Sequence, residues 1–162
     1  MPADVTVGTM ASARRQVMVD APVERVWDLI GDVNRHPEWW PRVEEVECDM
    51  LDVGCTYRQV TRRPGNTIET TISVEMLDDC QQLRVRCVDT GMYAHFLLTP
   101  AQDGTFVDGE IGVEEHGAAR LISGPFVRRW LRKSLEGLSR AATSAAAAGQ
   151  QPGNEGRKRS PA

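Results

Sequence analysis

The stretch from Val17 to Pro41 constrains this chain most, because it predicts a strand, a tight turn, a helix and a second short helix in close succession. Asp20 precedes the helix at a position where its carboxylate can accept amide hydrogens of the first turn, and Pro22 stands where a missing donor costs little. From Val23 to Ile30 apolar residues recur at helical spacing. The predicted buried face holds Val23, Val26, Trp27 and Ile30. This helix must therefore pack against the rest of the protein.

A second, broken short helix is predicted from Asp32 to Pro41, and it closes with two tryptophans between two prolines. Aromatic side chains in such a position fill the space between short helices and a sheet, and they can also form the wall of a ligand site. We expect one of Trp39 and Trp40 in the core and the other on a pocket wall, and the sequence leaves open which. His36 lies in the same exposed-looking segment, so a surface or capping role is predicted for it.

The chain between Val43 and His116 alternates short extended runs with turn residues, as is typical of an antiparallel meander. Its clearest run begins at Asn66, where apolar and polar residues alternate and one face is predicted to be buried. That face holds Ile68, Thr70, Ile72, Val74 and Met76. The buried faces of the next strands are predicted to hold Leu83, Val85 and Cys87, then Ala94, Phe96 and Leu98, then Val107, Gly109, Ile111 and Val113, with Glu115 after them. Six strands are therefore predicted to follow the opening one.

A long amphipathic helix is predicted to end at about Ala148, because apolar residues recur at three- and four-residue spacing while basic residues fall largely on the other side. Ser123, Gly124 and Pro125 interrupt its beginning. Proline removes a backbone donor and disfavours helical geometry in the residue before it. Two interpretations are open, a hinge over the mouth of a cavity and a simple helix start at Pro125.

Four features together carry a resemblance to a known family: the strand and helix up to Ile30, the Pro-Glu-Trp-Trp-Pro close, the run of strands and the long last helix. In these features the chain resembles the START-like (SRPBCC) superfamily, which includes the polyketide cyclase/dehydrase family. The resemblance covers the chain between Arg14 and Ala148. It implies an α+β helix-grip fold, in which a curved antiparallel sheet of about seven strands wraps around a long C-terminal helix, with two short helices after the first strand. A hydrophobic cavity between sheet and helix is implied as well, but no particular reaction.

A length of 162 residues makes one domain the economical interpretation. We expect a disordered N-terminal extension over residues 1–12, a START-like ligand-binding domain over residues 13–148 and a disordered tail over residues 149–162, whose composition buries too little apolar surface to order. No apolar run is long enough for a secretory or membrane segment, so a cytoplasmic location is predicted.

The net charge of −4 is unevenly distributed along the chain. Residues 117–148 carry +5, residues 149–162 carry +2 and residues 1–116 carry −11. A basic helix could contact an acidic lipid surface or a protein partner, whereas cations toward the C-terminal end of a helix are also ordinary surface electrostatics. Because no recognisable nucleic-acid module is present, no nucleic-acid partner is predicted.

Four cysteines form two pairs with six intervening residues, Cys48 with Cys55 and Cys80 with Cys87. Structural zinc sites usually separate paired ligands by two to four residues, so this spacing fits zinc poorly and no metal is predicted. Reduced thiols packed as small hydrophobes are the preferred interpretation. The sequence holds no nucleophile elbow, phosphate-binding glycine loop or HExxH motif, so no cofactor is predicted either.

A reaction inside an apolar cavity would need an acid or base whose pKa is moved toward neutrality by desolvation. Glu115 is the best candidate by strand parity, with a solvated carboxylate at the rim as the alternative. Tyr57 could supply a hydroxyl that orients a ligand carbonyl, and Thr70 could supply another. His95 is predicted to face solvent, and His116 to end a strand.

Binding or carriage of a small hydrophobic, lipid- or polyketide-like molecule is the predicted function, because the inventory of reactive polar groups is thin. One alternative is a polyketide cyclase, aromatase or dehydratase that uses Tyr57, Thr70 and Glu115. Another is a protein- or membrane-interaction module that uses the basic helix. The residues predicted to contact the ligand are Trp39, Trp40, Tyr57, Thr70, Ile72, Val74, Val85, Phe96, Leu98, Ile111, Val113, Phe126 and Trp130.

Overall fold

Seven strands form a single antiparallel sheet in the computed structural model, which describes residues 11–113 and 124–148. The strands are β1 (Ala11–Val19), β2 (Val43–Glu47), β3 (Thr56–Arg63), β4 (Asn66–Asp78), β5 (Gln82–Cys87), β6 (Met92–Ala101) and β7 (Gly104–Val113). The helices are α1 (Val23–Ile30), the 3-10 helix η1 (Val33–Glu38) and α2 (Gly124–Ala148). Several predictions fall outside the described residues: those for residues 1–10 of the expected extension, for the expected tail over 149–162, and for Glu115 and His116. The last two positions of the expected extension, 11 and 12, belong to β1.

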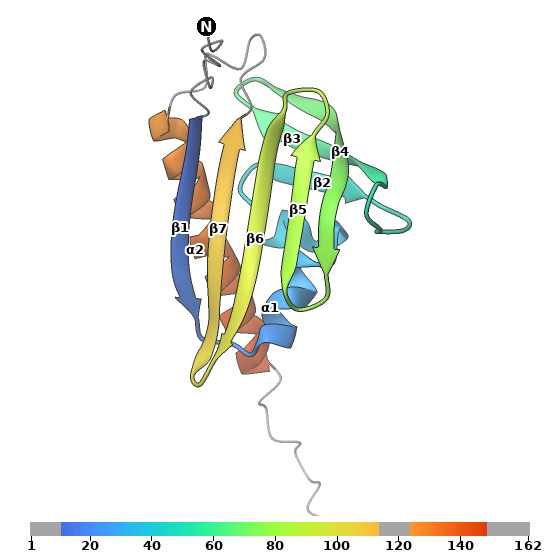
Figure 1. Ribbon diagram of the computed structural model, residues 1–162. Coiled ribbons are helices and arrows are strands. Elements are labelled where there is room, and N and C mark those ends of the chain that lie inside the picture. The colour runs from blue at the N-terminus through green and yellow to red at the C-terminus, as the bar shows by residue number, and fades with distance from the viewer. Residues whose placement is uncertain (1–10, 114–123, 149–162) are drawn as a thin grey trace, which may run out of the picture.

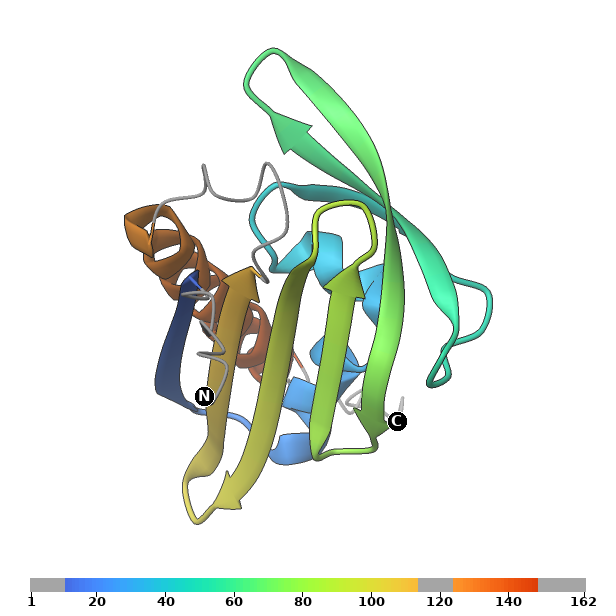
Figure 2. The same ribbon diagram turned by 45° about the horizontal axis from the view of Figure 1, so that its top comes forward.

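The sheet has the strand order β1-β7-β6-β5-β4-β3-β2, so the first strand pairs with the last. α2 lies across one face of the sheet, against β1 and β7 (Figure 1). A second view shows the curvature of the sheet, since β3 and β4 bend out of the plane of the other strands (Figure 2). We call the face toward α2 the inner face and the opposite one the outer face. The predicted α+β helix-grip fold, with two short helices after the first strand, is confirmed.

The opening segment follows the prediction in its elements but not in its cap. The helix predicted from Val23 to Ile30 is α1, and both ends are confirmed. The predicted cap by Asp20 is wrong, because the N-cap is Pro22, whose extended backbone precedes the helix without any side-chain hydrogen bond. In η1 it is the Asp32 carboxylate that accepts a capping hydrogen bond, from an amide 3.2 Å away. The buried residues of α1 are Val26, Leu29 and Ile30, while Val23 and Trp27 are half-buried.

The alternation predicted on β4 holds up to Val74 and then reverses. A register shift between Val74 and Met76 marks a β-bulge, after which Leu77 lies opposite Leu83. One extra residue in a strand exchanges its two faces, so Met76 is 43% exposed and its predicted burial is wrong. On the next three strands the predicted inner face is confirmed by the burial of Leu83, Val85, Ala94, Phe96, Leu98, Val107, Ile111 and Val113.

The last helix begins at Gly124, one residue before the simple start predicted at Pro125. A Cβ on Gly137 would lie 2.2 Å from the backbone oxygen of Trp39, so this glycine allows α2 to lie directly against the segment that follows η1. The helix buries Val127, Leu131, Ser134, Leu135, Leu138 and Ala142, and it exposes Arg128, Arg129, Arg132, Lys133 and Arg140. None of the described helices is long and apolar enough to cross a bilayer.

Candidate ligand-binding cavity

A cavity of about 330 Å³ lies between the inner face of the sheet and the first turns of α2. This volume is within the range of small-molecule sites. Its lining runs from the buried Ile111 to the exposed Arg63, so the cavity extends from the interior to the surface. The apolar wall consists of Trp40, Ile68, Ile72, Val85, Met92, Ala94, Ile111, Phe126 and Trp130.

The register of the central strands places three of these residues in a row. Val85 pairs with Ala94, and Ala94 pairs with Ile111, so their side chains stand side by side on the inner face. Ala94, in the middle, carries only a methyl group, which leaves space between its larger neighbours. Alternation on β4 adds Ile72 to the same wall. The cavity therefore follows from regular alternation combined with one small residue.

The mouth of the cavity is polar and lies along the end of β3. The Gln59 side-chain amide donates to the Thr61 hydroxyl at 3.2 Å, and the Thr70 hydroxyl donates to the Gln59 carbonyl at 3.4 Å. Arg62 and Arg63 follow on the same strand, where both are exposed. Most of the polar lining thus lies at the end of β3 and on its neighbour β4, with Thr90 as a further polar residue.

Arg42 forms the opposite side of the mouth in an uncommon backbone conformation. Its φ of 69° lies in the left-handed region, which costs a residue other than glycine on the order of 1 kcal/mol. Its carbonyl accepts a hydrogen bond of 2.7 Å from the Arg62 amide, and its guanidinium lies 5.6 Å from the centre of the Phe126 ring. These contacts hold Arg42 between the sheet and α2.

The structure brings only part of the predicted ligand-contacting set to this cavity. Those that line it are Trp40, Thr70, Ile72, Val85, Ile111, Phe126 and Trp130. Those placed instead in the packed interior are Trp39, Tyr57, Val74, Phe96, Leu98 and Val113. Leu98 and Phe96 lie farther along β6 than the cavity-lining Met92 and Ala94, and Trp39 and Phe96 belong to the aromatic cluster of the core.

The open question about the two tryptophans is answered by their contacts. The Trp39 indole donates a 2.8 Å hydrogen bond to the Leu29 carbonyl and belongs to the core. Trp40 stacks on Trp39 with the ring centres 5.3 Å apart, and it lines the cavity. Phe96 lies edge-on to both rings, at 5.6 and 5.5 Å. Trp40 is therefore the wall residue, and the other two hold it in place.

His36 supports this aromatic cluster from within. The surface position predicted for it is wrong, whereas the alternative capping role is supported by its contact with the Ile30 carbonyl at the end of α1. The side chain is fully buried, its ring centre lies 5.1 Å from that of Trp40, and its Nε2 lies 2.9 Å from the Ile30 carbonyl. Burial lowers the pKa of His36 to about 4, so the imidazole is neutral near pH 7. Its Nδ1 has no hydrogen-bond partner within the described part of the chain.

The three candidate catalytic residues are not assembled by the described structure. Thr70 lines the cavity, whereas Tyr57 lies in the core, where burial raises the pKa of its phenol and no described residue bonds its hydroxyl. Glu115 lies outside the described residues. His95 is on the outer face as predicted, half-buried, with its Nε2 2.9 Å from the Gln82 side-chain oxygen.

Sequence reasoning missed the wall residue Ile68 and most of the mouth, namely Arg42, Gln59, Thr61, Arg62 and Arg63. Ile68 could have been found, because the alternation on β4 places it on the same face as Thr70. Arg42 could not, because its position depends on a left-handed backbone and on Phe126, which is distant in sequence. In the described ranges no three metal-ligating side chains gather, and the four cysteines are free thiols.

Comparison with known proteins adds a family and a fold. The family model described as "Polyketide cyclase / dehydrase and lipid transport" matches residues 10–147. The structure is similar to protein NE0264 from Nitrosomonas europaea, with a TM-score of 0.71, 17% identity and coverage of 84% of this chain and 96% of that one. A START superfamily protein from Mycobacterium smegmatis gives a TM-score of 0.64 at 18% identity, over 85% of this chain and 97% of that one.

A third solved structure is the di-domain ARO/CYC StfQ from the steffimycin biosynthetic pathway, with a TM-score of 0.65 at 16% identity. The similarity covers 86% of this chain and 52% of that longer one. At such identities these likenesses establish the fold alone. No curated relative matches this chain.

Proposed function

This chain belongs to the polyketide cyclase/dehydrase and lipid transport family within the START-like superfamily, and on that premise we propose that it binds and carries a small hydrophobic, lipid- or polyketide-like molecule. The observation that supports this proposal is the cavity of about 330 Å³ between the sheet and α2. Apolar walls with a few polar groups at one end are what a site for a hydrophobic molecule needs.

The proposal sets the protein in the cytoplasm. All four cysteines are free thiols, and a reducing compartment keeps such thiols from forming disulfides.

Binding can be tested with N-phenyl-1-naphthylamine, a neutral dye whose emission rises in apolar surroundings. We expect saturable binding of one dye per protein. Ala94→Phe places a phenyl ring in the space beside Val85 and Ile111, so it is expected to weaken dye binding by about tenfold or more, which corresponds to about 1.4 kcal/mol. Native mass spectrometry of protein purified from its own host would then identify a co-purifying ligand.

Leu97→Phe is the matched control, because Leu97 lies on the same strand but is 39% exposed on the outer face. It is expected to leave dye binding unchanged. Unfolding curves of both variants verify that they are folded. Binding that survives in a folded Ala94→Phe variant, or that is absent in the unaltered protein, would contradict the proposal.

A polyketide cyclase or aromatase acting in the same cavity is the second candidate, and the observation in its favour is the Thr70 hydroxyl on the cavity wall. Such a reaction requires a folded, reactive chain and a few well-placed polar groups. Thr70→Val removes the hydroxyl at nearly constant shape. Unchanged turnover of a candidate polyketide in this variant would remove Thr70 from the mechanism.

A further inference from the structure

We propose that the ligand of this cavity is an amphiphile with an oxyanion head group, a carboxylate or a phosphate, held at the mouth by Arg42 and Arg63. This inference rests on the proposed function, since it names the chemical class of the molecule that the cavity binds. The argument comes from the charges around the mouth, from their partners and from the start of α2.

The charged side chains at the mouth are all of one sign. Among the described residues that line the cavity, the charged ones are Arg42, Arg62 and Arg63, and none is acidic. The hydrogen bond between the Arg62 amide and the Arg42 carbonyl joins the two chain segments that carry them. Cations at one mouth repel one another, and an anion bound there would reduce that repulsion.

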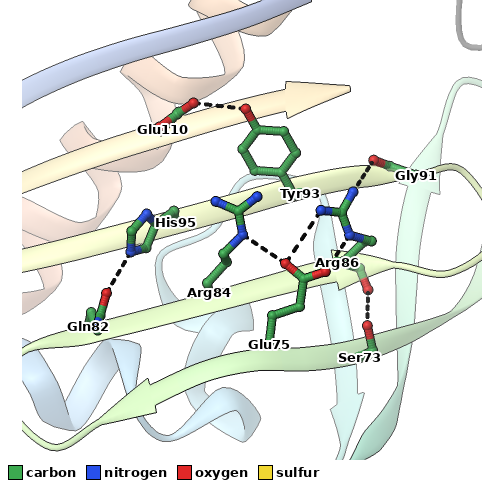
Figure 3. Close-up of polar contacts among 9 residues, drawn as sticks. All are labelled: Ser73, Glu75, Gln82, Arg84, Arg86, Gly91, Tyr93, His95 and Glu110. Atoms are coloured by element: carbon green, nitrogen blue, oxygen red, sulfur yellow. Dashed lines mark hydrogen bonds and ion pairs between the residues drawn. The ribbon is translucent and has the colours of Figure 1, made fainter. Parts of the chain in front are cut away.

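Two of these arginines lack a carboxylate partner in the described structure. Arg62 forms an ion pair with Glu44. No described carboxylate forms an ion pair with Arg42, whose guanidinium faces the Phe126 ring, or with Arg63. On the outer face, by contrast, Arg84 and Arg86 share the Glu75 carboxylate (Figure 3). On β3 and β5 the other described arginines, Arg58, Arg62, Arg84 and Arg86, are all paired with carboxylates.

The start of α2 adds positive potential at the same place. Phe126, in the first turn of this 25-residue helix, lines the cavity, and the first turn contains no acidic residue. A helix N-terminus carries a partial positive charge that favours anions.

The apolar wall behind the mouth defines the remainder of the ligand. Ile72, Val85 and Ile111 are buried and offer no charge or hydrogen bond to a second polar group. A guanidinium binds carboxylate or phosphate with two parallel hydrogen bonds. The ligand therefore has its anion at the surface end and its hydrocarbon portion inside.

Competition for bound N-phenyl-1-naphthylamine tests the head group at constant chain length. The competitors are decanoate, decyl phosphate and 1-decanol. We expect at least one anion to displace the dye at about tenfold lower concentration than decanol, a difference of about 1.4 kcal/mol. Salt should reduce this difference, since exposed charges are screened. A preference for decanoate or for decyl phosphate identifies the head group.

The Arg42→Gln/Arg63→Gln double variant is expected to abolish the difference between the anions and decanol. Glutamine at position 42 keeps a polar side chain on the left-handed backbone while it removes the guanidinium group and its charge. Arg58→Gln is the matched control, because Arg58 lies on the same strand, does not line the cavity and is paired with Glu45 and Glu69. The difference should persist in this control.

Equal displacement by decanol and both anions would overturn the oxyanion proposal, and so would a difference that persists in the folded double variant. Either result leaves hydrophobic binding intact. Failure of the dye itself to bind contradicts the proposed function instead, so the two failures are distinguishable.

Discussion

The two faces of the sheet differ in how completely their polar side chains are paired. On the outer face, Glu75 accepts hydrogen bonds from Arg84 and Arg86, and the Tyr93 hydroxyl donates to Glu110 at 2.8 Å (Figure 3). The Arg84 guanidinium lies 4.4 Å from the centre of the Tyr93 ring. Each group therefore lies beside a complementary one.

On the inner side, three buried polar atoms lack such partners. The Tyr57 hydroxyl, the Trp40 indole nitrogen and the His36 Nδ1 are buried and make no hydrogen bond within the described ranges. Each unpaired buried group costs about 1–3 kcal/mol. The physical reason is the surroundings, because an apolar core that encloses a cavity offers few donors or acceptors.

The bulge on β4 illustrates how the outer network is assembled. It falls between Val74 and Met76, so Glu75 is the residue at the irregularity, and its carboxylate reaches two arginines on β5. Across the network, Gly112 leaves room for Tyr93, because a Cβ there would lie 2.5 Å from the tyrosine oxygen. On the outer face, the bulge and a glycine thus allow polar side chains to pair, whereas the inner face keeps space for a ligand.

The largest effect is expected from pH acting on His36. Its folded pKa of about 4 lies below the ordinary value of 6.5. Between these pH values the unfolded state binds a proton that the native state does not, so the free energy of unfolding falls as pH falls. We expect a loss of about 2–3 kcal/mol between pH 7 and pH 4.5 from this residue.

Urea unfolding of the unaltered protein and of His36→Gln at both pH values isolates this contribution, because the stability difference between them should shrink in acid. His95→Gln is the comparison, since burial also lowers the pKa of His95 but the side chain is only half-buried, so a smaller pH dependence is expected. A stability difference for His36→Gln that does not depend on pH would show that the inner histidine does not stay neutral in the fold.

The next effect in size is expected on the outer face. Glu75→Ala leaves the partly buried Arg84 and Arg86 without their shared carboxylate, and we expect a loss of about 1–2 kcal/mol in the free energy of unfolding. Denaturant unfolding measures it. Glu69→Ala on the same strand removes an exposed carboxylate and should cost less. Equal losses in the two variants would mean that the pairing on the outer face adds nothing beyond surface charge.

The two tyrosines of the chain give the most direct comparison between the faces, because both are buried and only one hydroxyl is paired. Tyr93→Phe should lower the free energy of unfolding by about 1 kcal/mol, since it removes a hydrogen bond and leaves the Glu110 carboxylate without this donor. Tyr57→Phe should leave stability unchanged or raise it slightly. Thermal unfolding of both variants measures the two changes in stability. A larger loss for Tyr57→Phe than for Tyr93→Phe would contradict the difference in pairing between the two faces.

The smallest effect is expected at the exposed rim of the outer face. Arg14 pairs with Asp108 at 2.9 Å, but its side chain is 67% exposed. Exposed ion pairs contribute little. Arg14→Gln should therefore leave the denaturation midpoint within experimental error. A clear decrease in the midpoint would show that the exposed ion pair at the edge of the outer face also stabilises the protein, as the partly buried pairs at its centre do.

Much of the fold follows from local sequence patterns. Helical spacing defines α1 at both ends, and period-two alternation identifies the inner residues of β5, β6 and β7. These patterns are readable because each is set by neighbours a few residues away. The seven strands and the last helix were predictable for the same reason, and with them the part of the cavity wall around Val85 and Ile111.

Other features depend on groups that are distant in sequence. His36 packs against both tryptophans, and these are in turn held against Phe96 on β6 and by the close approach of α2. The exposure of Met76 results from a single extra residue in the pairing of two strands. No local pattern reports these contacts.

The amino-acid sequence by itself determined which residues are helical, which are extended and which sides of β5, β6 and β7 avoid water, because periodicity acts over a few residues. Only the tertiary structure decided where the inner face closes and where it leaves a cavity, and which arginines reach the mouth. Those outcomes depend on how side chains from β3, β4 and α2 fill a shared volume, and that filling is a property of the assembled fold.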